Sequence, residues 1–259
     1  HLRGPKTIHY YLYVILDVYS RFVPGWMMAE RERAGLAEQL IAETCAKQGI
    51  SRDELVLHSD RGSAMRSKTV AQLLIGLGVA KSHSRPYTPT DNPYSESQFK
   101  TMKYRPDYPQ RFNEQQEARD WARDFFGWYN HQHHHSGLGL MPPAAVHYGL
   151  AERMYEHRRQ VLAAAYAAHP ERFVHGEPTP SRWPAEVWIN PPQNSHQAAD
   201  LVGPATSERE PGTQAVSRGA CTRALDTAEY LATMERAPAP PGDTSLLLPK
   251  FECVLSQYC

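Results

Sequence analysis

Apolar residues form two closely spaced runs near the start of the chain, and both have the character of β-strands. Residues 10–18 read Tyr-Tyr-Leu-Tyr-Val-Ile-Leu-Asp-Val, an almost continuous apolar run that is typical of a strand buried on both faces. Residues 22–29 form the second run, in which Pro24 and Gly25 predict an irregular segment or a sheet edge. Because only three residues connect the two runs, we expect an antiparallel hairpin.

The pattern then changes to the three- and four-residue spacing of amphipathic helices. Residues 34–48 carry apolar or small side chains at this spacing, and Gly49 follows as a residue that ends helices. We expect further helices at residues 67–77, 92–104, 113–130 and, as one or two helices, 142–168. Short apolar runs predict strands at residues 55–58 and 79–84.

The order of these elements predicts an α/β fold in which helices flank a mixed sheet. We expect the sheet and its helices over residues 1–110 and a helical extension over residues 111–192. Residues 193–259 form the last part, in which prolines interrupt residues 193–249 and these show no sustained period, apart from one candidate helix near 221–235. This last part is therefore expected to be a disordered tail.

Composition excludes several classes of protein. Hydrophobic residues make up 41% of the chain, enough for a packed core, and the formal net charge of zero gives no sign of a nucleic-acid partner. We find no apolar run of about eighteen residues and no signal-peptide pattern, so neither a membrane span nor secretion is expected. None of the four cysteines forms a CxxC pair, which disfavours a zinc site and fits a reducing cytoplasm.

An aspartate follows the short strand predicted at residues 55–58. In the text LHSDRG, Asp60 comes at the carboxyl end of that strand, where ligands of α/β sheets collect, and Gly62 allows close approach. Taken alone, an aspartate in such a turn is more often a turn or cap residue than a ligand.

A second group of polar residues falls on the helix predicted at residues 92–104. Asn92, Glu96, Lys100 and Lys103 are spaced at four, four and three residues, so they share one helix face. The same spacing also describes an ordinary solvated face, and the helix alone does not decide between the two interpretations. The pair is more informative, because thirty-five residues separate Asp60 from Glu96.

With these residues in place, the chain resembles the integrase-core domain of insertion-sequence transposases of the DDE type, relatives of retroviral integrases. The matching texts are YLYVILDVYSRFVPGW, LHSDRGSAM, SRPYTPTDNPYSESQFKTMKYRP and WYNHQHHHSGLGLMPPAAV, and the resemblance extends over roughly residues 1–192. It implies a ribonuclease-H-like fold, metal-dependent DNA strand cleavage and strand transfer, and three carboxylates that hold two Mg²⁺ or Mn²⁺ ions. Asp60 and Glu96 match the second and third of these carboxylates.

The first carboxylate of the family has no match in this chain. The resemblance places it on a strand just before the text matched by residues 2–5, hence upstream of His1. Asp17 is a tempting substitute, but it matches a family position that does not bind metal. We therefore expect a truncated, inactive core, in which the missing strand leaves one edge of the strand at residues 10–18 unpaired.

The resemblance also implies partners. Lys100 and Lys103, with Asn92, match positions that contact DNA ends, and residues 50–111 carry ten lysines and arginines against six aspartates and glutamates. The partners expected are element ends and target DNA, a second copy of the chain when active, and no membrane, in the bacterial cytoplasm at the nucleoid. The histidines at 131 and 133–135 match a structural segment close to DNA, and zinc is the less favoured interpretation.

Two alternatives stay open at this point. A truncated core could survive as a remnant that binds DNA or dimerises without cutting, and metal titration would separate that case from an active site. A ribonuclease-H-type hydrolase acting on RNA–DNA hybrids is the other, and the thirty-five-residue gap and the WYN…HSGL text argue against it.

Overall fold

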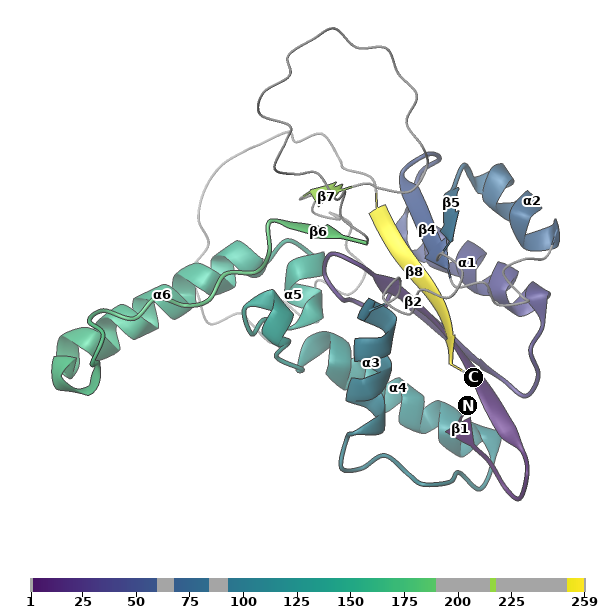
Figure 1. Cartoon of the computed structure of the whole chain (residues 1–259), viewed down its shortest axis with the longest axis horizontal. Helices are drawn as coiled ribbons and strands as arrows, with labels where there is room; N and C mark the ends of the chain where they lie inside the picture. Colours follow the sequence, from purple (N-terminus) through teal and green to yellow (C-terminus); the bar gives the residue numbers. More distant parts are fainter. Residues whose placement is uncertain (1, 60–67, 84–92, 190–214, 218–250, 259) are drawn as a thin grey trace, which may run out of the picture.

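The computed structural model describes residues 2–59, 68–83, 93–189, 215–217 and 251–258. Its main feature is a mixed sheet in the order β1-β2-β8-β4-β5 (Figure 1). β3 also pairs with β2, on the edge opposite β8. The strands are β1 (Leu2–Arg3), β2 (His9–Asp17), β3 (Gly25–Ala29), β4 (Leu55–Ser59), β5 (Ala80–His83) and β8 (Phe251–Tyr258). A separate two-stranded ribbon joins β6 (Glu186–Trp188) and β7 (Ala215–Ser217).

The predicted hairpin is confirmed. β2 pairs antiparallel with β3 from Tyr11 opposite Ala29 to Ile15 opposite Gly25. The second strand begins at Gly25 rather than at Phe22, because Pro24 has no N–H to donate. The main chain of Val23 is satisfied instead by the side-chain amide of Asn130, which accepts from its N–H at 2.9 Å and donates to its carbonyl at 3.0 Å.

Helices cover both faces of the sheet and divide the core into two layers (Figure 1). Tyr13 and Ile15 of β2 face a layer closed by α1 (Ala34–Gln48) and α2 (Lys68–Leu77). Leu12 and Val14, which alternate with them, face a layer closed by α3 (Pro93–Lys103) and α4 (Gln115–His131). This alternation explains why the β2 segment is apolar throughout, and it confirms the predicted α/β class.

The C-terminal strand β8 was not predicted. It lies between β2 and β4, antiparallel to the first and parallel to the second. The expectation of an unpaired edge on β2 is therefore wrong, because β3 and β8 pair with its two edges. Residues 215–217 and 251–258 are strands within the range expected to be a disordered tail, and the candidate helix near 221–235 lies outside the described residues.

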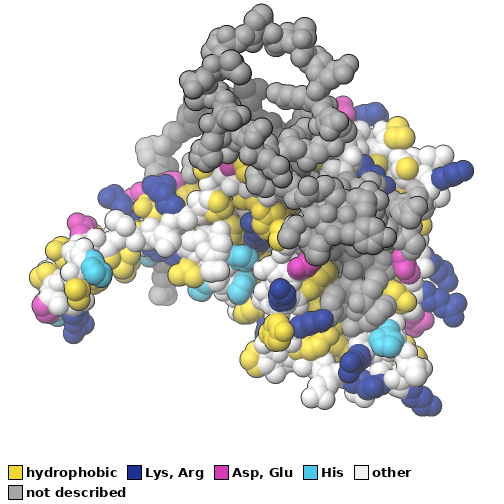
Figure 2. Space-filling view, viewed as in Figure 1, with side chains coloured by type: hydrophobic (Ala, Val, Ile, Leu, Met, Phe, Trp, Pro, Cys, Tyr) yellow, Lys and Arg dark blue, Asp and Glu magenta, His cyan; other side chains and the backbone are white. Residues whose placement is uncertain are grey.

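The helices after α4 lead away from the sheet. The single helix or pair expected at 142–168 is a pair, α5 (Pro143–His147) and α6 (Ala151–Ala168), flanked by short 3-10 turns at Ser136–Leu138 and Pro170–Arg172. α6 projects as an arm on which basic, acidic and histidine side chains are interspersed (Figures 1 and 2). Within the described ranges, no helix has the length and apolar character needed to span a membrane.

Candidate functional site

Helix α3 presents the charged residues that the sequence placed on one face. Glu96, Lys100 and Lys103 are all exposed, with the glutamate in the first turn and the lysines in the last. This distribution of charge suits the helix dipole. Met102 on the opposite side is fully buried among the apolar residues of β2 and α4. The described residues of this helix therefore form a charged, exposed face and a buried face that carries Met102.

The start of α3 is anchored to the turn between β2 and β3. The guanidinium carbon of Arg21 lies 3.8 Å from the ring centroid of Tyr94, and the Tyr94 hydroxyl donates to the carbonyl of Trp188 at 2.9 Å. Arg21 is only 8% exposed, and burial lowers the pKa of its guanidinium. Its Nη1 has no hydrogen-bond partner among the described residues, and the guanidinium lies over the Tyr94 ring. We infer that this stack positions the first turn of α3, which carries Glu96.

Sequence reasoning did not single out Arg21. The residue lies in a turn, has a positive φ of 62°, and donates its main-chain N–H to the Asp17 carbonyl at 2.8 Å. An arginine after Tyr-Ser in a turn ordinarily points to solvent, and no local pattern predicts its burial. Only the matched text YSRF of the family marks the position.

Asp60 and Asn92 lie outside the described residues, so their contacts with Glu96 stay predictions. The elements that lead to them are described. β4 ends at Ser59, directly before Asp60, and β4 is paired in parallel with β8. α3 lies against β8, and Glu96 belongs to its first turn (Figure 1). Asp60 thus follows a strand that pairs with β8, and Glu96 lies on a helix that contacts β8, while the convergence of the two side chains stays a prediction.

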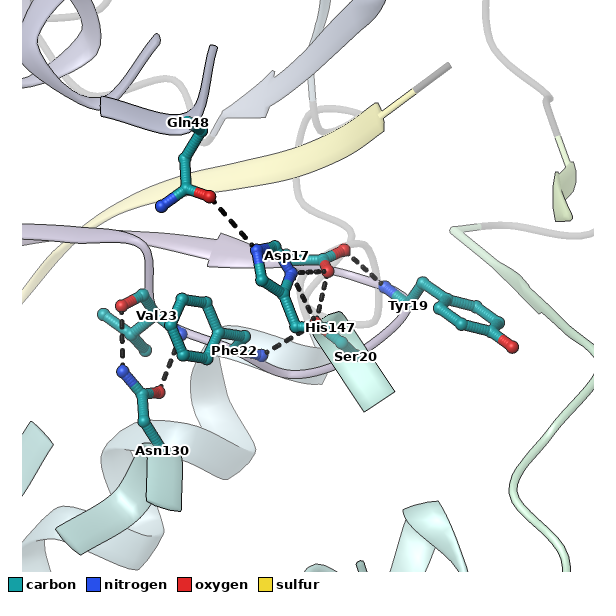
Figure 3. A network of polar contacts seen from close by, with 8 residues as sticks. All are labelled: Asp17, Tyr19, Ser20, Phe22, Val23, Gln48, Asn130 and His147. Atoms are coloured by element: carbon teal, nitrogen blue, oxygen red, sulfur yellow. Dashed lines mark hydrogen bonds and ion pairs between the residues drawn. The ribbon is translucent and has the colours of Figure 1, made fainter. Parts of the chain in front are cut away.

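Asp17, the candidate substitute for the first carboxylate, has both carboxylate oxygens bonded to neighbouring residues of the fold (Figure 3). One carboxylate oxygen accepts the main-chain N–H of Tyr19 at 3.0 Å. The other accepts a hydrogen bond from the Ser20 hydroxyl and lies 2.9 Å from Nδ1 of His147 on α5. The side chains of Asp17 and His147 are both buried, which leaves the carboxylate no open side for a metal ion.

The contacts of Asp17 keep it ionised. Burial by itself raises the pKa of this carboxyl, but the hydrogen bond and charge of His147, with the bonds from Ser20 and Tyr19, outweigh burial and hold the pKa below its ordinary value. His147 also stacks on Phe22, with ring centroids 4.3 Å apart, and its Nε2 lies 3.3 Å from the side-chain oxygen of Gln48. The network therefore joins the hairpin turn, α1 and α5, and the role of Asp17 in it is to stabilise the fold.

Two histidines after α4, His133 and His135, pack against neighbouring rings. His133 stacks on Tyr129 with centroids 5.5 Å apart, and Nδ1 of His135 accepts the N–H of Gly137 at 3.1 Å. Burial, with the charges of Arg21 and His133, lowers the pKa of His135 to about 4, and burial lowers that of His133 as well. Within the part of the chain that the structure describes, no three His, Cys, Asp or Glu side chains gather as a metal site.

Comparison with known proteins assigns the class. Two family models, each described as an integrase core domain, match residues 1–89 and residues 77–143. Together they cover more than half of the chain, which therefore belongs to the integrase core family. Its relatives come from insertion sequences. It is 32% identical over 134 residues to the transposase of insertion sequence element IS904 from Lactococcus lactis, an alignment covering 51% of this chain and 53% of that protein.

A further relative and one solved structure are also similar to the chain. The chain is 32% identical over 136 residues to a 31 kDa protein of insertion element IS600 from Shigella sonnei, covering 52% of this chain and 50% of that protein. The catalytic core domain of BIV integrase is similar at 21% identity and a TM-score of 0.41, over 56% of this chain and 89% of that one. The chain spans about half the length of the curated relatives it matches.

Proposed function

We propose that this chain carries the DNA-processing core of a bacterial insertion-sequence transposase, which cuts and joins DNA strands at the ends of its element. The observation that carries the proposal is the exposed face of α3, where Glu96 stands with Lys100 and Lys103 on a helix that packs on the sheet. The membership of residues 1–143 in the integrase core family supports it. The DNA substrate would place the protein at the bacterial nucleoid.

Integrase cores generally use divalent metal ions, and the donors present suit Mg²⁺ or Mn²⁺. These ions take hard oxygen ligands, and the Glu96 carboxylate is exposed on α3. Asp60 and Glu96 would hold the metal. In phosphoryl transfer a metal pair activates the attacking oxygen and stabilises the leaving one.

The remaining residues of the face would bind and orient the DNA. Lys100 follows Glu96 by one helical turn and Lys103 by two, so their ammonium groups would lie beside a phosphate held at Glu96. Asn92, one turn before Glu96 in the sequence, would add a neutral donor. Arg21 and Tyr94 would fix the angle at which this helix meets the substrate, because they anchor its first turn to the hairpin.

Metal titration tests the proposed site. Mn²⁺ binding to the full chain, measured by calorimetry, should be lost in Asp60→Asn and in Glu96→Gln. Asp124→Asn is the matched control, because it removes an exposed carboxylate from a different helix, α4. Equal Mn²⁺ binding by all four proteins would overturn the site assignment.

A non-catalytic, DNA-binding or dimerising remnant is the second candidate function. It is favoured by the exposed Lys100 and Lys103 of α3, because contacts between cations and phosphates need no metal site. Such a protein would retain DNA binding through the lysines of α3 and would show no strand cleavage with Mg²⁺ or Mn²⁺.

A further inference from the structure

The last strand of the chain fills the central place in the sheet. β8 pairs with β2 at six positions, from Leu12 opposite Tyr258 to Asp17 opposite Cys253. It pairs with β4 at five, from Leu55 opposite Phe251 to Ser59 opposite Leu255. No other described strand connects β2 to β4, so the sheet is continuous only because of this segment.

The segment is held by its side chains as well as by its main chain. Cys253 is 4% exposed and Leu255 is 2% exposed, and both belong to the apolar layer formed by β2, β4 and α1. Burial of such residues stabilises the sheet in addition to the ladder of hydrogen bonds. Without β8, one edge of β2 and one edge of β4 would face each other unpaired, which is the geometry that accepts an extended peptide.

The segment arrives from far along the sequence. Sixty-two residues separate Trp188, the end of β6, from Phe251. The two chain ends nevertheless meet at β2, where Leu2 lies opposite Tyr10 and Tyr258 lies opposite Leu12. Figure 1 shows the N and C marks side by side at the foot of the sheet. A strand joined to either end of the chain could therefore reach the same place.

We propose that the gap between β2 and β4 is a strand-binding site, whose ligand is an extended segment that runs antiparallel to β2 and parallel to β4 and buries alternate side chains such as Cys253 and Leu255. Residues 251–258 of the chain itself are its occupant. The proposal is independent of the proposed activity on DNA, because it rests on strand pairing and burial alone.

Thiol labelling of the full chain tests the occupancy. Cys253 reports on β8, and Cys45, buried on α1 in the same apolar layer, reports on the rest of the core. With labelling at each cysteine resolved by peptide mass mapping, both thiols should react about a hundredfold more slowly than in the urea-unfolded chain. Labelling of Cys253 at the unfolded rate while Cys45 stays protected would overturn the proposal.

A matched pair of substitutions tests what holds the strand. Leu255→Asp places a charge in the apolar layer, whereas Ile75→Asp makes the same kind of change at a side chain of α2 that is 75% exposed. Leu255→Asp should speed labelling of Cys253 about tenfold or more, whether or not labelling of Cys45 also becomes faster. Ile75→Asp should change the labelling rate of Cys253 by less than about twofold. Equal labelling in the two variants would contradict the proposal.

A rearranged chain tests the site itself. Residues 251–259 are moved in front of His1, so that the strand enters from the other end of the polypeptide. Because the chain ends meet at β2, Cys253 should keep its protection to within about threefold. A rearranged chain that fails to fold, or that folds with Cys253 labelled at the unfolded rate, would show that the gap does not accept this strand as a ligand.

Discussion

Asp17 and Glu96 are both carboxylates close to the central strands, and their surroundings are opposite. Asp17 is buried, and its two oxygens are occupied by Tyr19, Ser20 and His147. Glu96 is exposed on a helix face shared with Lys100 and Lys103. A carboxylate whose partners all lie within the protein stabilises the fold, whereas one that stands in solvent among cations can bind a ligand. Asp17 is therefore assigned to stability, and Glu96 is proposed for function.

The largest effect should be on DNA cleavage. Residues 1–259 alone should cleave no element-end DNA with Mg²⁺ or Mn²⁺, because one of the three carboxylates is not matched and in-line displacement needs fixed metal geometry. Adding about ten upstream residues that carry an aspartate should allow cleavage, which Glu96→Gln should then abolish. Since β8 fills the gap between β2 and β4, Leu255→Asp should make that gap easier for the added strand to enter.

The opposite result would overturn the assignment of Asp17 to stability. Cleavage by residues 1–259 without any addition, lost on Asp17→Asn with the fold intact, would make Asp17 the third metal ligand.

The next effect should be on stability. Asp17→Ala leaves His147 and Ser20 buried without their partner and should lower the free energy of unfolding by about 3 kcal/mol. Glu96→Gln should change it by less than about 0.5 kcal/mol, because the side chain is exposed. Asp60→Asn should likewise leave stability unchanged or raise it, since it removes one of two carboxylates expected to repel. Urea unfolding of the three variants measures this, and a large loss in Asp60→Asn would identify Asp60 as a structural cap.

A smaller effect should appear in DNA binding. The double substitution Lys100→Ala and Lys103→Ala should weaken binding to all DNA sequences alike and reduce the slope of log affinity against log salt by up to about two units. Affinity measured from 50 to 200 mM salt tests this. The control replaces the partly buried Arg119 and the exposed Arg123 of α4, and should leave the slope nearly unchanged. The same slope in the lysine variant and the wild type would remove the lysines from the interface.

The smallest effect should be a dependence of folding stability on pH. The folded pKa of Asp17 lies below its ordinary value of 3.8, so its contribution to stability is complete above that value and is lost as the pH falls through the lower, folded pKa. The difference in stability between the wild type and Asp17→Asn should therefore shrink as the pH falls below about 4. A difference that grows as the pH falls would contradict the assignment.

How much the sequence could predict differs between the two ends of the chain. The β2–β3 hairpin, α1 and β4 were predicted within a few residues, because local patterns specify them: a continuous apolar run, a helical period and a glycine at the helix end. β8 was missed, because an eight-residue segment of mixed apolar and polar residues after a proline-rich stretch has no local pattern that reveals its partner. Its place depends on pairing with residues more than 190 positions away.

The features of the candidate site also fall into those that a local pattern predicts and those that depend on contacts between distant residues. The charged face of α3 follows from helical spacing and was predicted correctly. The Asp17–His147 pair and the Arg21–Tyr94 stack join residues 130 and 73 positions apart, and no spacing rule connects them. What the sequence could not supply is the tertiary contact that separates a structural carboxylate from one available to a ligand.

A crystal structure of the chain grown with Mn²⁺ tests the central claim most directly, because anomalous scattering locates the metal. The account predicts Mn²⁺ bound by the carboxylates of Asp60 and Glu96, which would lie within a few ångströms of one shared metal position, with Asp17 still paired to His147. Carboxylates of Asp60 and Glu96 more than about 10 Å apart, or Mn²⁺ bound at Asp17, would contradict it.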